Sequence, residues 1–177
     1  IGANFGGDVM LHQYGTGNLT INVPVSSSTG QLIKDGPGNV TLNGITDYSG
    51  PTFLFGGCVS ISNITNSGAN GPFGCGSQIY IRNATLQYTG VSGTTNRTIT
   101  IYDDGGTIDV PSGNLTLTGT YTVLGPFTKT SAGTLNLSGN GNFSAPVIIS
   151  GGNLVIGSAT GFSTISPYNY GNFGVPL

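Results

Sequence analysis

The strongest constraint on the fold of this chain is an internal repeat with a period of 95 residues. Two stretches match without a gap, and Lys34 aligns with Lys129 as Ile61 aligns with Ile156 (34 to 129 and 61 to 156, each 95 positions). Apolar and polar residues alternate within both stretches, which is typical of half-buried β-strands. A repeat of this kind predicts a continuous array of similar structural units rather than separate domains.

The repeat sets the expected domain organisation. We predict a single β-solenoid domain over residues 1–177. It contains two related copies, residues 17–111 and 112–161, and the segments 1–16 and 162–177 form its two ends.

The turn signals favour a parallel over an antiparallel arrangement. Predicted strands recur about every ten residues and are separated by glycines, of which the chain has 32. Asp104-Gly105, between the apolar runs 99–101 and 108–110, is the one clear hairpin signal, and antiparallel meanders need several. We therefore expect an all-β fold, a right-handed parallel β-helix with roughly 20–25 residues per coil and about seven or eight coils. A β-sandwich is the alternative.

Composition excludes several classes of function. Four Lys and Arg residues in 177 cannot neutralise a phosphate backbone, so we expect no nucleic-acid partner. Hydrophobic residues make up 36% of the chain and are evenly spaced, which favours a folded protein over disorder. No apolar run has the length of a membrane-spanning helix. The first residue is Ile1 rather than Met, so we expect that a leader was removed or that the chain is an excerpt.

Two cysteines, Cys58 and Cys75, lie among turn-forming residues. Their positions fit an extracellular disulfide that closes a loop. The alternative is two unpaired cysteines that act as small hydrophobic side chains.

We find no catalytic, cofactor-binding or metal-binding motif and expect no enzymatic activity. His12 is the only histidine, and the chain has no Gly-x-Ser-x-Gly nucleophile elbow. Asp103, Asp104 and Asp109 form the only acidic cluster, and Asp109 is expected to point outward beside a turn. Calcium binding is one interpretation of this cluster, and a solvated turn is the favoured one.

Eight Asn-x-Ser/Thr triplets are candidate N-glycosylation sites. Six of them have an aliphatic middle residue, so strand alternation alone also explains the pattern. The triplets begin at Asn18, Asn39, Asn63, Asn83, Asn96, Asn114, Asn136 and Asn142.

The two repeat copies resemble a known family. The second copy reads Phe127-Thr-Lys-Thr-Ser-Ala-Gly-Thr-Leu-Asn-Leu-Ser-Gly and is followed by Gly151-Gly-Asn-Leu-Val-Ile. The first copy reads Leu32-Ile-Lys-Asp-Gly-Pro-Gly-Asn-Val-Thr-Leu-Asn-Gly, with Tyr48-Ser-Gly after it. This pattern resembles the passenger-associated strand repeat of bacterial autotransporters over about residues 17–160. The resemblance implies a right-handed β-helix at a bacterial or archaeal cell surface.

These observations support two hypotheses about function. The first is a secreted or cell-surface structural solenoid that assembles head to tail into a fibre or surface layer, because the ends of a β-helix expose unpaired backbone groups. The alternative is an adhesin-type passenger that binds glycans or host surfaces, with Tyr80, Tyr88 and Tyr121 as outward contacts unless they pack inward.

Overall fold

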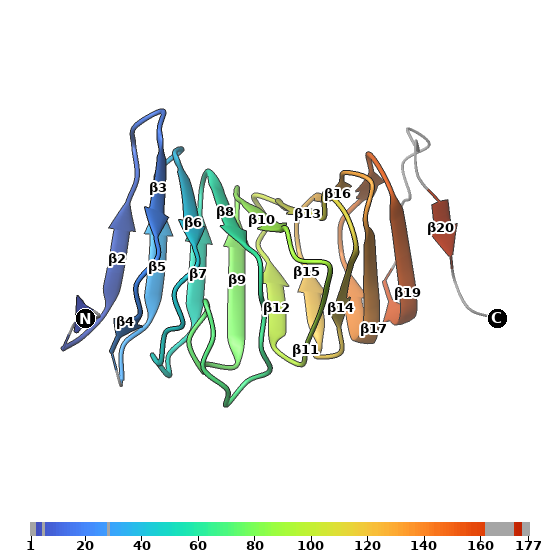
Figure 1. Cartoon of the computed structure of the whole chain (residues 1–177). Coiled ribbons are helices and arrows are strands. Elements are labelled where there is room, and N and C mark those ends of the chain that lie inside the picture. Colours follow the sequence, from blue (N-terminus) through green and yellow to red (C-terminus); the bar gives the residue numbers. More distant parts are fainter. Residues whose placement is uncertain (1–2, 5, 28, 162–171, 175–177) are drawn as a thin grey trace.

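The chain winds into a parallel β-solenoid of about seven turns (Figure 1). The computed structural model describes residues 3–4, 6–27, 29–161 and 172–174. In this part of the chain every ladder between named strands is parallel, and there is no helix. Paired residues in adjacent coils are between 18 positions (Gly141 to Ala159) and 27 positions (Thr52 to Ile79) apart. The predicted parallel β-helix is confirmed, and the β-sandwich, which needs antiparallel neighbours, is wrong.

Successive strands of the chain visit three faces in turn. Face 1 contains β2 (Val9–His12), β5 (Leu32–Asp35), β7 (Thr52–Phe55), β9 (Gln78–Arg82), β12 (Thr98–Ile101), β15 (Tyr121–Val123) and the ends of β17 (Thr134–Phe143) and β19 (Asn153–Thr160). Face 2 contains β3 (Asn18–Ile21), β6 (Asn39–Leu42), β8 (Cys58–Ile61), β10 (Thr85–Tyr88), β13 (Gly106–Asp109), β16 (Phe127–Thr130) and β18 (Val147–Ile149). Face 3 contains β1 (Ala3–Asn4), β4 (Val25–Ser26), β11 (Ser92–Thr95), β14 (Asn114–Leu117), the starts of β17 and β19, and β20 (Asn172–Gly174).

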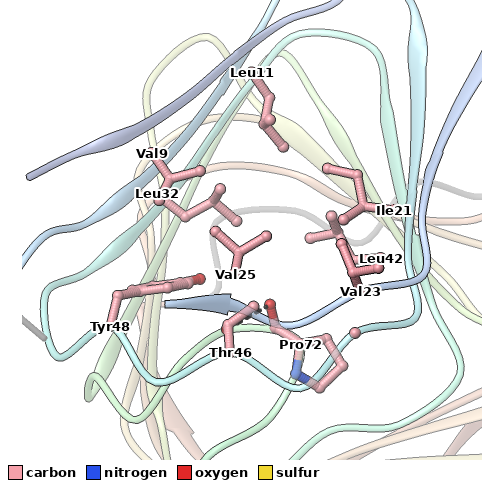
Figure 2. A pocket seen from close by; sticks show the side chains of 11 residues that line it. Val9, Leu11, Ile21, Val23, Val25, Leu32, Leu42, Thr46, Tyr48 and Pro72 are labelled. Carbon is pink, nitrogen blue, oxygen red and sulfur yellow. Dashed lines mark hydrogen bonds between the residues drawn. The ribbon is translucent and has the colours of Figure 1, made fainter. Parts of the chain in front are cut away.

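The core is built from rows of inward side chains that lie over one another. Alternate residues of each strand point inward, and the parallel register places them above their counterparts in the next coil. Leu54, Ile81 and Ile101 form one such row. Figure 2 shows the interior of the first coils, where aliphatic side chains from all three faces converge. Each fully buried aliphatic side chain contributes about 1.5–3 kcal/mol. Val40 and Leu137, one from each repeat copy, both lie buried in these rows, as the alternation of apolar and polar residues in the two copies predicts.

Two lysines interrupt these apolar rows at equivalent corners. Lys34 and Lys129 are both fully buried, and their ammonium groups donate to backbone carbonyls rather than to carboxylates. The Lys34 ammonium donates to the backbone carbonyls of Gly36 (2.5 Å) and Gly56 (2.7 Å). Each lysine therefore connects the corner of its own coil with the corner of the next.

The Lys129 corner repeats this arrangement 95 residues later. Its ammonium donates to the carbonyls of Ser131 (2.9 Å) and Gly151 (3.3 Å), at the positions that correspond to Gly36 and Gly56. It also donates to the carbonyl of Thr130 (2.5 Å). The lysine of the repeat is thus a structural cation, because it satisfies corner carbonyls that would otherwise be buried without a donor.

The two repeat copies occupy different faces of the solenoid. β5 of the first copy lies on face 1, whereas its counterpart β16 lies on face 2. β8 lies on face 2, whereas its counterpart, the start of β19, lies on face 3. The 95-residue period is therefore four turns plus one face, rather than four turns. The same sequence pattern fits any face, because all three present the same alternation and the same spacing between coils.

The one hairpin signal marks a corner. Asp104-Gly105 connects β12 to β13, but these strands lie on different faces and each pairs with the coils before and after it. Gly105 adopts a φ of 81°, which glycine tolerates without strain. Positive φ suits a tight turn of either kind, so the dipeptide alone cannot distinguish a hairpin from a solenoid corner.

The predicted disulfide between Cys58 and Cys75 is wrong, because both cysteines are free. Cys58 begins β8 on face 2. Cys75 lies in the loop before β9, where its backbone N–H donates to the carbonyl of Tyr48 and its thiol lies 3.5 Å from the same oxygen. The two cysteines therefore lie at different corners, Cys58 at the start of face 2 and Cys75 before face 1. Turn-forming residues around two cysteines do not by themselves show that the cysteines are close in space.

The expected terminal segments are described only in part. β1 pairs with β4, and β20 pairs with the start of β19, so each adds a short parallel strand to an end of the solenoid. Residues 1–2, 162–171 and 175–177 lie outside the described residues. Within the described part, no helix is long and apolar enough to cross a membrane.

We predict that Lys129→Met lowers the free energy of unfolding by about 1–3 kcal/mol, because the carbonyls of Ser131 and Gly151 lose their buried donor. Urea unfolding near neutral pH measures this change. Thr128→Ala, at a half-buried outward position on the same strand, is the matched control and should change stability by less. A Lys129→Met variant as stable as the wild type would contradict the structural role of the ammonium.

The same lysine predicts a pH dependence. Burial lowers the pKa of Lys129 from 10.5 to about 8. Between these two values the unfolded chain holds a proton that the folded chain has lost, so the contribution of Lys129 to stability rises with pH. From pH 8 upward, the free energy of unfolding of the wild type should rise relative to that of Lys129→Met. A difference that stays flat or shrinks between pH 8 and 10 would show that this pKa is not lowered.

Candidate functional site

Aromatic side chains gather on the outside of face 1. In β7 the buried Thr52 and Leu54 point inward, which turns Phe53 outward. Phe53 pairs with Tyr80 of the next coil, and their rings stack with centroids 4.8 Å apart and planes 12° apart. Tyr80 also stacks on Tyr102, at 5.7 Å and 22°. Such ring pairs contribute about 0.5–1.5 kcal/mol each beyond area burial, so this aromatic stack (Phe53, Tyr80, Tyr102) is held in place.

A polar trough runs beside the aromatic stack, along the corner between faces 1 and 2. It consists of an open hollow of about 590 Å³ and an adjoining one of about 240 Å³, which share Asn83 and Asp104. The hollow exists because glycines form the corner turns and carry no side chains. The first hollow is lined by Asp35, Gly36, Pro37, Phe55, Gly56, Gly57, Arg82, Asn83 and Asp104. The second is lined by Asn83, Ala84, Thr85, Asp104, Gly105, Gly106, Thr107, Pro126 and Thr128.

At Gly57 the backbone requires glycine. Its φ is 62°, and a Cβ there would lie 2.5 Å from the Lys34 ammonium nitrogen. Any side chain at this corner would therefore displace the buried lysine. The corner that holds the coils together is thus the same one that leaves the trough open.

An ion pair crosses the trough between adjacent coils. Arg82 Nε lies 2.5 Å from Asp104 Oδ2, and both side chains are about half exposed. An exposed pair of this kind contributes only about 0–1 kcal/mol to stability. It therefore leaves charged hydrogen-bonding groups accessible to a ligand rather than serving mainly to hold the fold.

A second carboxylate lies toward the first coil. Asp35 accepts hydrogen bonds from the Gly36 N–H (2.5 Å) and from the Tyr14 hydroxyl (3.1 Å). These two donors, the Gly36 N–H first, hold the pKa of Asp35 below its usual range. His12 Nδ1 lies 3.4 Å from the same carboxylate. Asp35 is consequently ionised at neutral pH and can accept further hydrogen bonds.

The long loop between β8 and β9 is held by a buried arginine. This loop, residues 62–77, extends beyond the neighbouring coils in Figure 1. The Arg97 guanidinium is fully buried and donates to the backbone carbonyls of Thr65 (3.0 Å), Phe73 (2.9 Å) and Gly74 (2.7 Å), and also to that of Gly76. A planar group with five N–H donors suits several converging carbonyls, as a lysine would not. The loop is therefore an ordered part of the solenoid.

Of the three tyrosines expected to contact a ligand, only Tyr80 points outward. Tyr88 and Tyr121 are buried in the core, so for these two the alternative of inward packing is the one observed. Tyr88 is the last residue of β10 and follows the inward alternation of Leu86. Tyr121 begins β15 and packs its ring against buried Phe143.

The acidic cluster does not gather around one point. Asp104 pairs with Arg82, whereas Asp109 accepts hydrogen bonds from Gln87 (2.9 Å) and Thr130 (2.7 Å). Asp109 lies between inward Ile108 and Val110, as expected, but neighbouring side chains bury it, so it is not solvated. Within the described residues, no group of three His, Cys, Asp or Glu side chains could hold a metal ion.

The eight Asn-x-Ser/Thr triplets mostly follow strand alternation. Seven of the asparagines are exposed and Asn136 is half-buried. Five of the six aliphatic middle residues are buried, and Leu19, in the first coil, is the exception. Burial of the middle residue accounts for the pattern, and glycosylation of these asparagines stays a prediction.

Comparison with known proteins identifies the repeat. The family described as Passenger-associated-transport-repeat matches residues 32–60 and 127–156. The chain is also 32% identical over 168 residues to the adhesin BmaC autotransporter of Brucella suis biovar 1 (strain 1330). The alignment covers 88% of this chain and 5% of that relative, so the chain spans a small part of its length. No solved structure matches the chain. The resemblance noted in the sequence is confirmed.

We predict that Arg97→Met lowers the free energy of unfolding by more than about 3 kcal/mol, because several buried carbonyls each lose a donor worth about 1–3 kcal/mol. The loop should also become sensitive to proteases. The matched control is Arg82→Gln at the exposed arginine, which should stay within about 0.5 kcal/mol of wild type. Equal effects of the two substitutions in denaturant unfolding would contradict the role of Arg97 in holding the loop.

Proposed function

We propose that this β-solenoid, which carries two passenger-associated-transport-repeats, is an adhesive segment of a cell-surface or secreted autotransporter-type passenger. The relative it resembles is an autotransporter adhesin, and a long, regular solenoid suits a protein that presents binding groups away from a cell. The observation that carries the proposal is the aromatic stack beside the polar trough. Together they form an accessible surface on which aromatic rings and charged groups lie side by side over several coils.

Exposure of these rings supports binding rather than packing. Phe53, Tyr80 and Tyr102 are each half-buried, so part of each ring faces solvent. The strands β7, β9 and β12 pair with one another through their backbones, and this pairing does not use the outward faces of the rings. Beyond the stack, the same outward row is polar on one side, at Thr100 and Thr122, and apolar on the other, at Ile33 and Met10. Partly exposed aromatic side chains gathered on one part of a face are typical of an interaction site.

We propose that the segment acts by binding and not by catalysis. His12, a candidate base, is exposed and lies beside an ionised carboxylate at the first coil. The side chains along the trough offer hydrogen bonds and apolar contact, but no nucleophile paired with a base. The fibre or surface-layer subunit, the first hypothesis from the sequence, draws no support from the adhesin relative, whereas the adhesin alternative does.

We predict that the purified chain, labelled with a fluorophore, binds saturably to the surface of cultured host cells. Tyr80→Ser combined with Tyr102→Ser should reduce this binding at least about tenfold, because it removes two rings of the aromatic stack. Thr122→Ser, on the same face and outside the stack, is the control and should bind as wild type does. Urea unfolding of each variant confirms that the solenoid is intact.

Two outcomes would overturn the proposal. One is saturable binding that the double substitution leaves unchanged, which would place adhesion elsewhere on the chain. The other is the absence of saturable binding to any cell type tested.

A further inference from the structure

The geometry points to a ligand for the trough. Resting on the proposed adhesive function, we infer that the trough binds an extended, uncharged carbohydrate chain that lies along the solenoid axis. Three features of the trough lead to this class of ligand: its shape, its mixture of side chains and its charge.

The shape of the trough suits a linear polymer. Its lining passes from Gly36 through Gly56 and Asn83 to Gly105 and Pro126, which belong to successive coils. Adjacent coils are about 4.8 Å apart, so the trough is several times longer than this step and open at the top. A compact ligand would leave most of it empty, whereas an extended chain can contact one coil after another.

The side chains suit a polyhydroxylated ligand. Phe55 lines the trough, and its ring is tilted 48° from that of Phe53, so it does not continue the aromatic stack. Tyr14 is 66% exposed and donates its hydroxyl to Asp35 at the first-coil end. Sugar rings have apolar C–H faces and hydroxyl edges. Aromatic rings can pack against the C–H faces of a sugar, and the carboxylate between them can accept hydrogen bonds from its hydroxyls.

The polar groups are of the kind that bind neighbouring hydroxyls. The Asp35 and Asp104 carboxylates accept hydrogen bonds, the Arg82 guanidinium donates them, and the Asn83 amide does both. Asn83 has a φ of 47° at its corner and is exposed. Because Arg82 and Asp104 already pair, they are preorganised and need little further ordering when a ligand binds.

The charge of the trough selects against acidic glycans. Its accessible charged groups are two carboxylates, Asp35 and Asp104, and one guanidinium, Arg82. The Lys34 ammonium lies buried beneath the trough, where it donates to the carbonyls of Gly36 and Gly56. The pKa of Asp35 is held low by its hydrogen bonds, so it stays ionised. A sulfate or uronic acid group would meet these two accessible carboxylates at close range, and the chain as a whole carries a formal charge of −2. Neutral and N-acetylated sugars avoid this repulsion.

A glycan microarray followed by calorimetric titration tests the inference. The array should contain neutral, N-acetylated, sialylated and sulfated oligosaccharides, and the chain should bind neutral or N-acetylated ones. Affinity for the best of these should rise with its length until the trough is filled. Phe55→Ser and Arg82→Gln should each lower the affinity at least about tenfold, while Thr122→Ser should leave it unchanged.

A further substitution isolates the charge. Asp35→Asn keeps the size of the side chain and removes its charge. It should therefore lower the ratio of the affinity for neutral glycans to the affinity for acidic glycans. Preference for acidic glycans by the wild type would overturn the inference, as would binding that is indifferent to Phe55→Ser and Arg82→Gln. Binding to cells that depends on Tyr80 and Tyr102, with no glycan bound on the array, would also refute the carbohydrate ligand. That last result would leave the proposed adhesive function standing.

Discussion

The structure depends on the in-register stacking of parallel coils. Each inward side chain rests on its counterpart in the coils above and below, so the core consists of continuous rows rather than a single cluster. A one-residue slip in any coil would turn its inward row to solvent. Coils of different length therefore differ in their turns and loops, and the strands keep their register. The longest coil, Thr52 to Ile79, places its additional residues in the loop that Arg97 holds.

Corners are where the packing and the binding surface meet. Glycines allow the coils to approach closely there, and the buried ammonium groups of Lys34 and Lys129 connect the carbonyls of one corner to the next. The absence of side chains at the corner of Lys34 leaves a trough between the outward residues of faces 1 and 2. Both consequences come from the same backbone requirement, so the trough needs no specialised insertion. It gains its chemistry from residues beside the corner, such as Phe55 and Arg82.

The sequence was sufficient to predict the fold class but not the site. The 95-residue repeat and the alternation around Val40 and Leu137 led to the parallel solenoid and its inward rows. The aromatic stack was missed, since Phe53 and Tyr80 become neighbours only once the 27-residue coil between them is known. The alternation Thr-Phe-Leu-Phe at 52–55 was the available signal for outward rings. Burial of Lys34, Lys129 and Arg97 also escaped sequence reasoning, because each is satisfied by backbone carbonyls that carry no residue-specific signal.

Pulsed electron paramagnetic resonance measures the stacking most directly. Met10, Thr100, Thr122, Asn142 and Thr160 lie in one outward row of face 1, each in a different coil. In a background with Cys58→Ser and Cys75→Ser, spin labels at Met10 and at each of the other positions should give distances that increase by about 4.8 Å per coil. Distances that fail to increase in this order would contradict the parallel, in-register solenoid.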